Sequence, residues 1–126
     1  MSKAITILGS TGTIGDSTLK VLSLHPDKFS LFALTAYSNH QKMFEQCVVW
    51  QPEYAVMVEE KAADSLERKA KKAGLKVKVI WGIAGLEYVA SHSKTDYVMA
   101  GIVGAAGLLP NLAAARAGKR VMLANK

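Results

Sequence analysis

A glycine-rich loop near the amino terminus constrains this chain of 126 residues more than any other feature. Gly9, Gly12 and Gly15 follow the apolar run of residues 4–8 and precede a segment of helical periodicity. The positions that recur with helical spacing are Ile14, Thr18, Val21 and Leu22. A loop of this kind aims backbone N–H groups and the positive end of the helix dipole at one point. The sequence therefore predicts a phosphate or pyrophosphate site at the start of the first helix.

Each glycine has its own expected role in this loop. Gly9 permits a tight turn out of the strand, Gly12 lets the backbone approach a pyrophosphate, and Gly15 lets the helix pack closely on the sheet. The spacing is G-x-x-G-x-x-G and not the commoner G-x-G-x-x-G, so the position between strand and helix carries the inference. The alternative is a glycine-rich turn without a ligand. No Gly-Lys-Ser/Thr closes the motif, which excludes a Walker A loop.

Apolar runs alternate with segments of helical periodicity along the whole chain. The predicted strands are 4–8, 29–36, 54–58, 77–80, 97–100 and 120–124. The predicted buried helix positions include Met43, Phe44, Cys47 and Val48, then Ala62, Ala63, Leu66, Ala70 and Ala73. Two further helices are expected over about 83–92 and from about 108. Because most strands are apolar on both faces, we predict one α/β domain, 1–126, with a doubly wound, mainly parallel sheet and helices on both faces, a Rossmann-type fold.

The net charge of +6 does not by itself indicate a nucleic-acid partner. Many of the cations lie on the predicted outer face of one helix, where solvated charges are common. They are Arg68, Lys69, Lys71 and Lys72. Trp50 and Trp81 are predicted to be core or rim aromatics, because nothing around them resembles a base-stacking platform. Nucleic-acid binding is therefore not expected.

Cysteine content and hydropathy favour a cytoplasmic protein. Cys47 is the one cysteine, which excludes an intramolecular disulfide and fits a reducing compartment. The apolar run of residues 4–8 is too short for a signal peptide. The apolar stretch 98–109 is interrupted by glycines and too short to cross a bilayer. No membrane partner is expected.

The end of the second predicted strand favours NADP over NAD. An NAD site usually places a carboxylate there to hold the ribose 2′-hydroxyl. Here the strand is followed by Tyr37, Ser38, Asn39 and His40, with Lys42 close behind. Hydroxyl, amide and basic groups suit a 2′-phosphate better than a hydroxyl. The alternative is an ordinary polar loop in which Ser38 or Asn39 caps the next helix, and both roles can coexist.

Catalytic and metal-ligating residues are not predicted in this chain. His25, His40 and His92 are scattered without metal-ligand spacing, and helix N-terminal charge explains Glu59 adequately. The last residues, Asn125 and Lys126, emerge from the sixth predicted strand on the ligand side of the sheet. The chain stops there, so we expect its final residues to belong to a site that is only partly present.

Three segments carry a resemblance to a known family. They are G-S-T-G-T-I-G at 9–15, M-A-G-I-V-G-A-A-G-L-L-P at 99–110, and R-A-G-K at 116–119 followed by L-A-N-K at 123–126. In this order they resemble 1-deoxy-D-xylulose 5-phosphate reductoisomerases, the NADPH- and metal-dependent enzymes of the non-mevalonate isoprenoid pathway. The resemblance extends over the whole chain, and the second segment is its most specific part.

The resemblance implies a role for individual residues. The NADPH contacts would be made by Thr11, Gly12, Thr13, Ile14, Tyr37, Ser38, Asn39 and Asn125. Gly101 would border the nicotinamide, and Lys126 would contact the phosphorylated substrate. Family members often carry a basic residue where Ser38 stands here. Phosphate recognition in this chain is therefore expected to depend on Asn39, His40 or Lys42 instead.

The resemblance also implies what lies beyond this sequence. The family continues with a catalytic domain that supplies acidic ligands for Mg²⁺ or Mn²⁺, and then with a helical carboxyl-terminal domain. The complete homodimeric enzyme converts 1-deoxy-D-xylulose 5-phosphate to 2-C-methyl-D-erythritol 4-phosphate. Residues 1–126 would bind NADPH without catalysing this reaction. The alternative is a free-standing NADP-binding sensor or regulatory module, which shares every cofactor feature.

Overall fold

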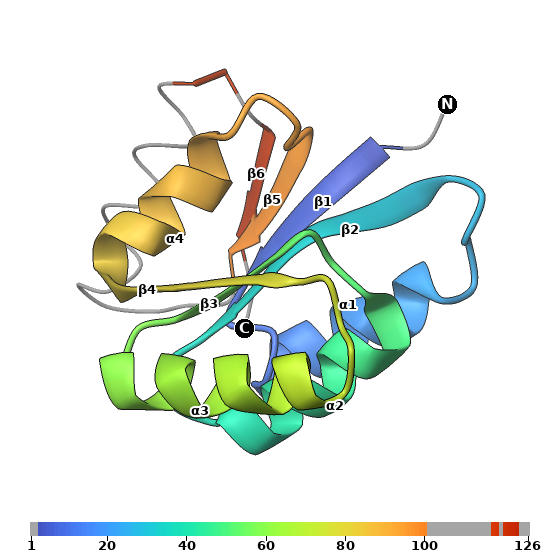
Figure 1. Cartoon of the computed structure of the whole chain (residues 1–126). Coiled ribbons are helices and arrows are strands. Elements are labelled where there is room, and N and C mark those ends of the chain that lie inside the picture. Colours follow the sequence, from blue (N-terminus) through green and yellow to red (C-terminus); the bar gives the residue numbers. More distant parts are fainter. Residues whose placement is uncertain (1–2, 101–116, 119, 124–126) are drawn as a thin grey trace.

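The computed structural model describes residues 3–100, 117–118 and 120–123, and its strands and helices alternate along the chain (Figure 1). The strands are β1 (Lys3–Leu8), β2 (Phe29–Ala36), β3 (Tyr54–Met57), β4 (Lys78–Trp81), β5 (Tyr97–Ala100) and β6 (Arg120–Leu123). The helices are α1 (Thr13–Leu22), α2 (His40–Trp50), α3 (Glu60–Lys72) and α4 (Gly82–Ser91). The helix expected from about residue 108 lies outside the described residues.

The strands form one parallel sheet in the order β4-β3-β2-β1-β5-β6. The chain adds β2, β3 and β4 on one side of β1, and α4 then returns it across the sheet to β5 on the other side. This reversal of strand order beside β1 is the point where doubly wound folds bind their ligands, outside the carboxyl ends of the strands. The predicted fold class and parallel sheet are confirmed, and β4 lies at the edge, as its alternating lysines indicated.

Side-chain alternation along the strands divides the core between the two faces of the sheet. Ile5 and Ile7 of β1 pack with α1, α2 and α3, and Leu34 of β2 faces the same way. The opposite face buries Ala33 of β2 and Val56 of β3 against α4. Figure 1 shows α1, α2 and α3 below the sheet and α4 on its other side. Because both faces are covered, the strands are apolar throughout, which is the pattern that predicted a parallel sheet.

Three apolar residues that were expected on the inner face of a helix are exposed instead. Val21 and Val48 are 57% and 44% exposed, and Ala73 is also exposed because it lies just past the end of α3. For the two valines the cause is the same: three or four apolar positions define a stripe, and the outermost residue of the stripe is rotated away from the contact with the sheet. Within the described ranges, no helix has the length and hydropathy needed to cross a bilayer.

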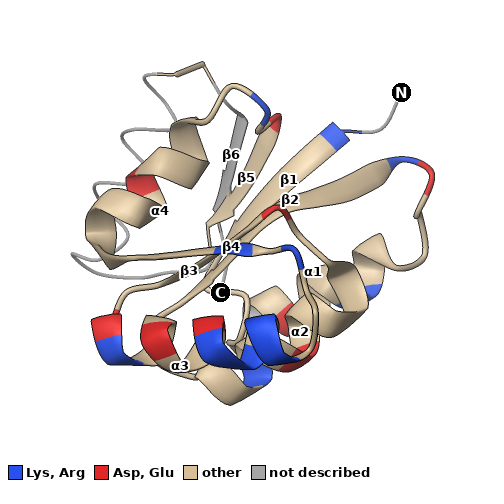
Figure 2. Cartoon of the chain, viewed as in Figure 1, with Lys and Arg blue, Asp and Glu red and all other residues tan. Residues whose placement is uncertain are grey.

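The charged residues of α3 lie on its outer side, as predicted for most of them (Figure 2). Glu60 stands in its first turn and Lys69, Lys71 and Lys72 in its last, an arrangement that complements the helix dipole. Lys69 differs from the prediction, because it is only half-exposed and contacts α2.

Candidate functional site

The glycine-rich loop lies at the carboxyl edge of the sheet, between the end of β1 and the start of α1. Gly9 has a φ of 86°, a left-handed conformation that favours glycine, and it turns the chain sharply out of the strand. The next residue, Ser10, is fully buried and donates its backbone N–H to the Thr35 carbonyl oxygen at 2.7 Å. The loop is therefore fixed against the neighbouring strand β2, beside the reversal of strand order.

Gly15 is required for packing, as predicted. A Cβ placed on this residue would lie 2.4 Å from the Cα of Ser10 and 2.5 Å from the carbonyl oxygen of Gly9. Both of these are backbone atoms, which cannot move aside as the end of a flexible side chain can. The absence of a side chain at Gly15 therefore allows α1 to begin directly against the turn that leaves β1.

Gly12 is different, because none of the described residues crowds the space beside it. Its φ of −82° and ψ of 178° can be adopted by any residue. A Cβ added to it would lie 3.7 Å from the Gly9 carbonyl oxygen, which is an ordinary contact distance. The residue is exposed. The fold therefore does not need glycine at this position, whereas a ligand that approaches the backbone does.

The amino terminus of α1 carries no side-chain cap. Gly12 is its N-cap residue and offers no oxygen, and the first intrahelical bond of the turn runs from the Asp16 N–H to the Gly12 carbonyl at 2.9 Å. The backbone N–H groups that precede Asp16 belong to Thr13, Ile14 and Gly15. The first N–H groups of a helix have no partner within it, and with the helix dipole they favour an anion. The predicted residues of this loop thus form a site suited to a phosphate.

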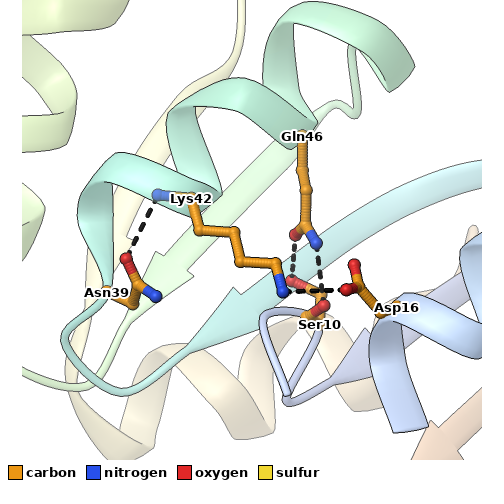
Figure 3. Close-up of polar contacts among 5 residues, drawn as sticks. All are labelled: Ser10, Asp16, Asn39, Lys42 and Gln46. Atoms are coloured by element: carbon orange, nitrogen blue, oxygen red, sulfur yellow. Dashed lines mark hydrogen bonds and ion pairs between the residues drawn. The ribbon is translucent and has the colours of Figure 1, made fainter. Parts of the chain in front are cut away.

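The side-chain amide of Gln46, from α2, contacts the loop at Ser10 (Figure 3). Its Nε2 donates to the Ser10 carbonyl oxygen, and its Oε1 accepts from the Ser10 hydroxyl, both at 2.8 Å. The sequence pattern does not identify Gln46 as part of the site. The available signal was its position: Gln46 lies between Met43 and Cys47 on the buried stripe of α2, where a polar side chain needs a specific partner.

Lys42 forms an ion pair with Asp16, across the space between α2 and α1 (Figure 3). The Nζ–Oδ2 distance is 2.9 Å, and both side chains are partly exposed. The hydrogen bond from this ammonium lowers the pKa of the Asp16 carboxyl below its ordinary value of 3.8. Asp16 stands in the first turn of α1, so the ion pair neutralises a carboxylate close to the anion site. Lys42 was expected to help bind a 2′-phosphate, but here its charge is directed at Asp16.

The second predicted loop, Tyr37–Asn39, follows β2 at the same edge of the sheet. All three residues are exposed. The Asn39 Oδ1 accepts the Lys42 N–H at 3.2 Å and caps α2, which confirms one of the two predicted capping residues (Figure 3). The Tyr37 carbonyl accepts the Glu59 N–H at 3.0 Å, so the loop is tied to the end of β3. Exposed hydroxyl and amide groups next to a helix amino terminus suit an anionic ligand.

Lys69 brings a cation from α3 to the start of α2. Its Nζ donates to the Gln41 Oε1 at 2.7 Å and lies 3.1 Å from the His40 Nδ1. Neither of the ion pairs among the described residues involves Lys69. No local pattern predicts this contact, since the periodicity of α3 placed Lys69 on the solvent side.

Gly101, Asn125 and Lys126 lie outside the described residues. Among the residues that the structure describes, no three histidine, cysteine, aspartate or glutamate side chains gather as metal ligands would. Cys47 is buried in the core, and burial raises the pKa of its thiol to about 12, so it is a structural thiol at neutral pH.

Comparisons with known proteins agree on one family. The sequence profile of the 1-deoxy-D-xylulose 5-phosphate reductoisomerase family matches residues 5–126. The reductoisomerase of Nitrosomonas eutropha is 57% identical over 122 residues, which are 97% of this chain and 30% of that protein. That of Paraburkholderia phytofirmans is 52% identical over 126 residues, 100% of this chain and 31% of its own length. The chain thus spans about 30% of the length of these relatives.

Solved structures of reductoisomerases share the fold. A complex described as DOX-P reductoisomerase with NADPH, fosmidomycin and magnesium aligns with a TM-score of 0.94 and 41% identity, covering 98% of this chain and 30% of the other. The enzyme of Zymomonas mobilis in complex with NADPH aligns with a TM-score of 0.91 and 34% identity, covering 99% and 32%.

Proposed function

The chain belongs to the 1-deoxy-D-xylulose 5-phosphate reductoisomerase family, and from this premise we propose that residues 1–126 are a single NADPH-binding domain. The observation that carries the proposal is the amino terminus of α1, which has no side-chain cap and begins at Gly12, where no described residue crowds the backbone. A pyrophosphate fits this place because it can accept N–H groups from the loop without meeting a side chain. The solved relatives named with NADPH support the choice of cofactor.

The pyrophosphate contacts are assigned to Thr11, Gly12, Thr13 and Ile14. Thr11 is half-buried and Thr13 is exposed, so the loop runs from the core to the surface over these residues. Their position between β1 and α1 supports the assignment, since backbone N–H groups in such a turn can converge on one anion. The side chains at the two threonine positions are not required to ligate the phosphate for this to hold.

The adenosine end is assigned to Tyr37, Ser38 and Asn39, with Lys69 as the nearby cation. No carboxylate follows β2 in the sequence before α2 begins, which favours NADPH over NADH. Lys69 supplies the basic group that many family members carry in the loop itself. Its contact with His40 places positive charge at the start of α2, where a 2′-phosphate would be held. Lys42 is not assigned to the 2′-phosphate, because its ammonium group forms the ion pair with Asp16.

The activity of the whole protein is a further part of the proposal. Within a complete enzyme, the domain would take part in converting 1-deoxy-D-xylulose 5-phosphate to 2-C-methyl-D-erythritol 4-phosphate. NADPH would supply the hydride for the reduction. Asn125 would contact the cofactor and Lys126 the phosphorylated substrate, while Mg²⁺ or Mn²⁺ would bind to residues beyond this chain. A homodimer and a cytoplasmic location complete the proposal, and the lone buried thiol of Cys47 fits a reducing compartment.

Calorimetric titration of the 126-residue chain with NADPH tests the binding function. We expect saturable binding of one NADPH per chain, weaker than in a complete enzyme because the nicotinamide side is not covered by a second domain. Incubation with 1-deoxy-D-xylulose 5-phosphate and Mn²⁺ should oxidise no NADPH. An absence of NADPH binding would contradict the proposal, and reproducible turnover by the purified chain would contradict its restriction to cofactor binding.

A further inference from the structure

Helix α2 contacts both halves of the proposed cofactor site. Its amino terminus follows the Tyr37–Asn39 loop directly, and Asn39 caps it. Two turns later, the side chain of Gln46 reaches the phosphate loop, as Figure 3 shows. The position of the phosphate loop is therefore linked by one helix to the loop that would hold the adenosine end.

The contact between Gln46 and Ser10 is specific to an amide. Gln46 is 7% exposed and Ser10 is fully buried, so water does not compete for either bond. The side chain offers one donor to a carbonyl oxygen and one acceptor to a hydroxyl, which matches both polar groups of Ser10 that β2 leaves unused. Two uncharged side chains, those of asparagine and glutamine, carry both functions on one carbon atom, and glutamine is the longer of the two.

The rest of the loop is held on the opposite side. The Ser10 N–H donates to the Thr35 carbonyl at 2.7 Å, and the Gly9 N–H donates to the Thr35 hydroxyl at 3.0 Å. Among the described residues, the turn beyond is held to the start of the loop by a long hydrogen bond, from the Gly12 N–H to the Gly9 carbonyl oxygen at 3.4 Å. Ser10 is thus the last firmly held residue before the N–H groups that would meet the pyrophosphate. Its three polar groups are all satisfied, one by β2 and two by Gln46.

We propose that Gln46 is a positioning residue for cofactor binding: its amide fixes Ser10, and so presents the N–H groups of residues 11–13 to the pyrophosphate. This inference rests on the proposed function. A loop that is already ordered loses less conformational entropy when the ligand binds. A change that disorders the loop should therefore lower the affinity for NADPH. Lys42 acts on the same loop from the same helix, because it neutralises Asp16 beside the anion.

Three variants separate positioning from folding. Gln46→Met keeps the length and removes both hydrogen bonds, and Ser10→Ala removes only the one to Oε1. Glu45→Met is the matched control, because it puts the same side chain at the neighbouring exposed position, whose one described contact is with Gln41. We expect NADPH affinity to fall about tenfold in Gln46→Met, less in Ser10→Ala, and under about twofold in the control.

Phosphorus NMR of bound NADP⁺ gives a readout that a purely structural role would not produce. In Gln46→Met the pyrophosphate resonances should shift, while the 2′-phosphate resonance keeps its parental position. In the free chain, the amide resonances of residues 11–13 should also move, and this test needs no nucleotide. If the folded variant keeps parental affinity, pyrophosphate shifts and amide shifts, the inference is overturned.

Gln46→Glu provides a second test should Gln46→Met not fold. An ionised carboxylate at position 46 would be repelled by the Ser10 carbonyl oxygen and by the Asp16 carboxylate, which Lys42 only partly offsets, whereas a protonated one can donate to the carbonyl oxygen. The ratio of variant to parent Kd for NADP⁺ should therefore be larger at pH 8 than at pH 5.5. A ratio that does not change with pH contradicts the inference. A parent chain that fails to bind any nucleotide contradicts the proposed function itself.

Discussion

Gly12 and Gly15 lie in one loop, but a side chain should have different effects at the two positions: at Gly12 it should lower the affinity for NADPH, and at Gly15 it should lower the stability of the fold. The Cβ of Gly12→Val would make an ordinary van der Waals contact with the Gly9 carbonyl oxygen, 3.7 Å away, and no closer one among the described residues, at a φ and ψ that valine adopts. Loss of the favourable N-cap glycine costs up to about 1 kcal/mol. The reduced entropy of the unfolded chain offsets about 0.4–1 kcal/mol of this. The free energy of unfolding should therefore stay within about 1 kcal/mol of the parent.

Binding should respond in the opposite way. A phosphate oxygen must come within about 3 Å of the backbone nitrogen to accept its hydrogen bond. The branched side chain in Gly12→Val occupies that approach. Each charge-assisted bond lost costs about 1.5–3 kcal/mol, so the loss of even one lowers NADPH affinity at least about tenfold.

Gly15→Ala is the contrasting variant. Its added Cβ would lie 2.4 Å from the Ser10 Cα, and only a shift of the backbone relieves that overlap. We expect a loss of about 3 kcal/mol in the free energy of unfolding, at the upper end of overpacking effects. Urea unfolding and calorimetric titration with NADPH measure the two quantities. A Gly12→Val chain that unfolds, or that binds NADPH like the parent, refutes this reasoning, as does a Gly15→Ala chain of parental stability.

Four further outcomes are expected. Ser38→Asp should lower NADPH affinity about tenfold or more, and less at high salt, because a carboxylate repels the 2′-phosphate, while NADH binding should change less; equal losses in paired titrations would contradict this. Lys69→Met should weaken NADPH more than NADH in the same titrations, and an unchanged preference would remove Lys69 from the site. Because the pKa of Asp16 is lowered in the folded state, its ion pair stabilises the fold above pH 3.8, and this contribution is lost as the pH falls through the folded-state pKa. Asp16→Asn should flatten that part of the curve of stability against pH. An unaltered curve would contradict a stabilising ion pair. Cys47, with a thiol pKa of about 12, should resist iodoacetamide at pH 8 until urea unfolds the chain, and rapid labelling of the folded chain would show that the thiol is accessible.

The sequence by itself determined the fold class and the position of the phosphate loop. Both depend on local patterns: strands that are apolar on both faces require helices on both faces, and a glycine loop between a strand and a helix creates an anion site wherever it occurs. The capping role of Asn39 could also be predicted, because an N-cap bond joins residues only three apart. These inferences needed no knowledge of how distant segments meet.

Only the tertiary structure decided which side chains support the loop. The contacts of Gln46 with Ser10 and of Lys42 with Asp16 join residues 36 and 26 positions apart, and that of Lys69 with His40 joins residues 29 apart. Periodicity places a residue on a helix face but does not specify which neighbouring helix that face meets, or at what height. For this reason Lys42 was expected beside a phosphate and was found on Asp16, and Lys69 was expected in solvent and was found at the start of α2. The packing of α2 against α1 and α3, which no local pattern encodes, sets both contacts.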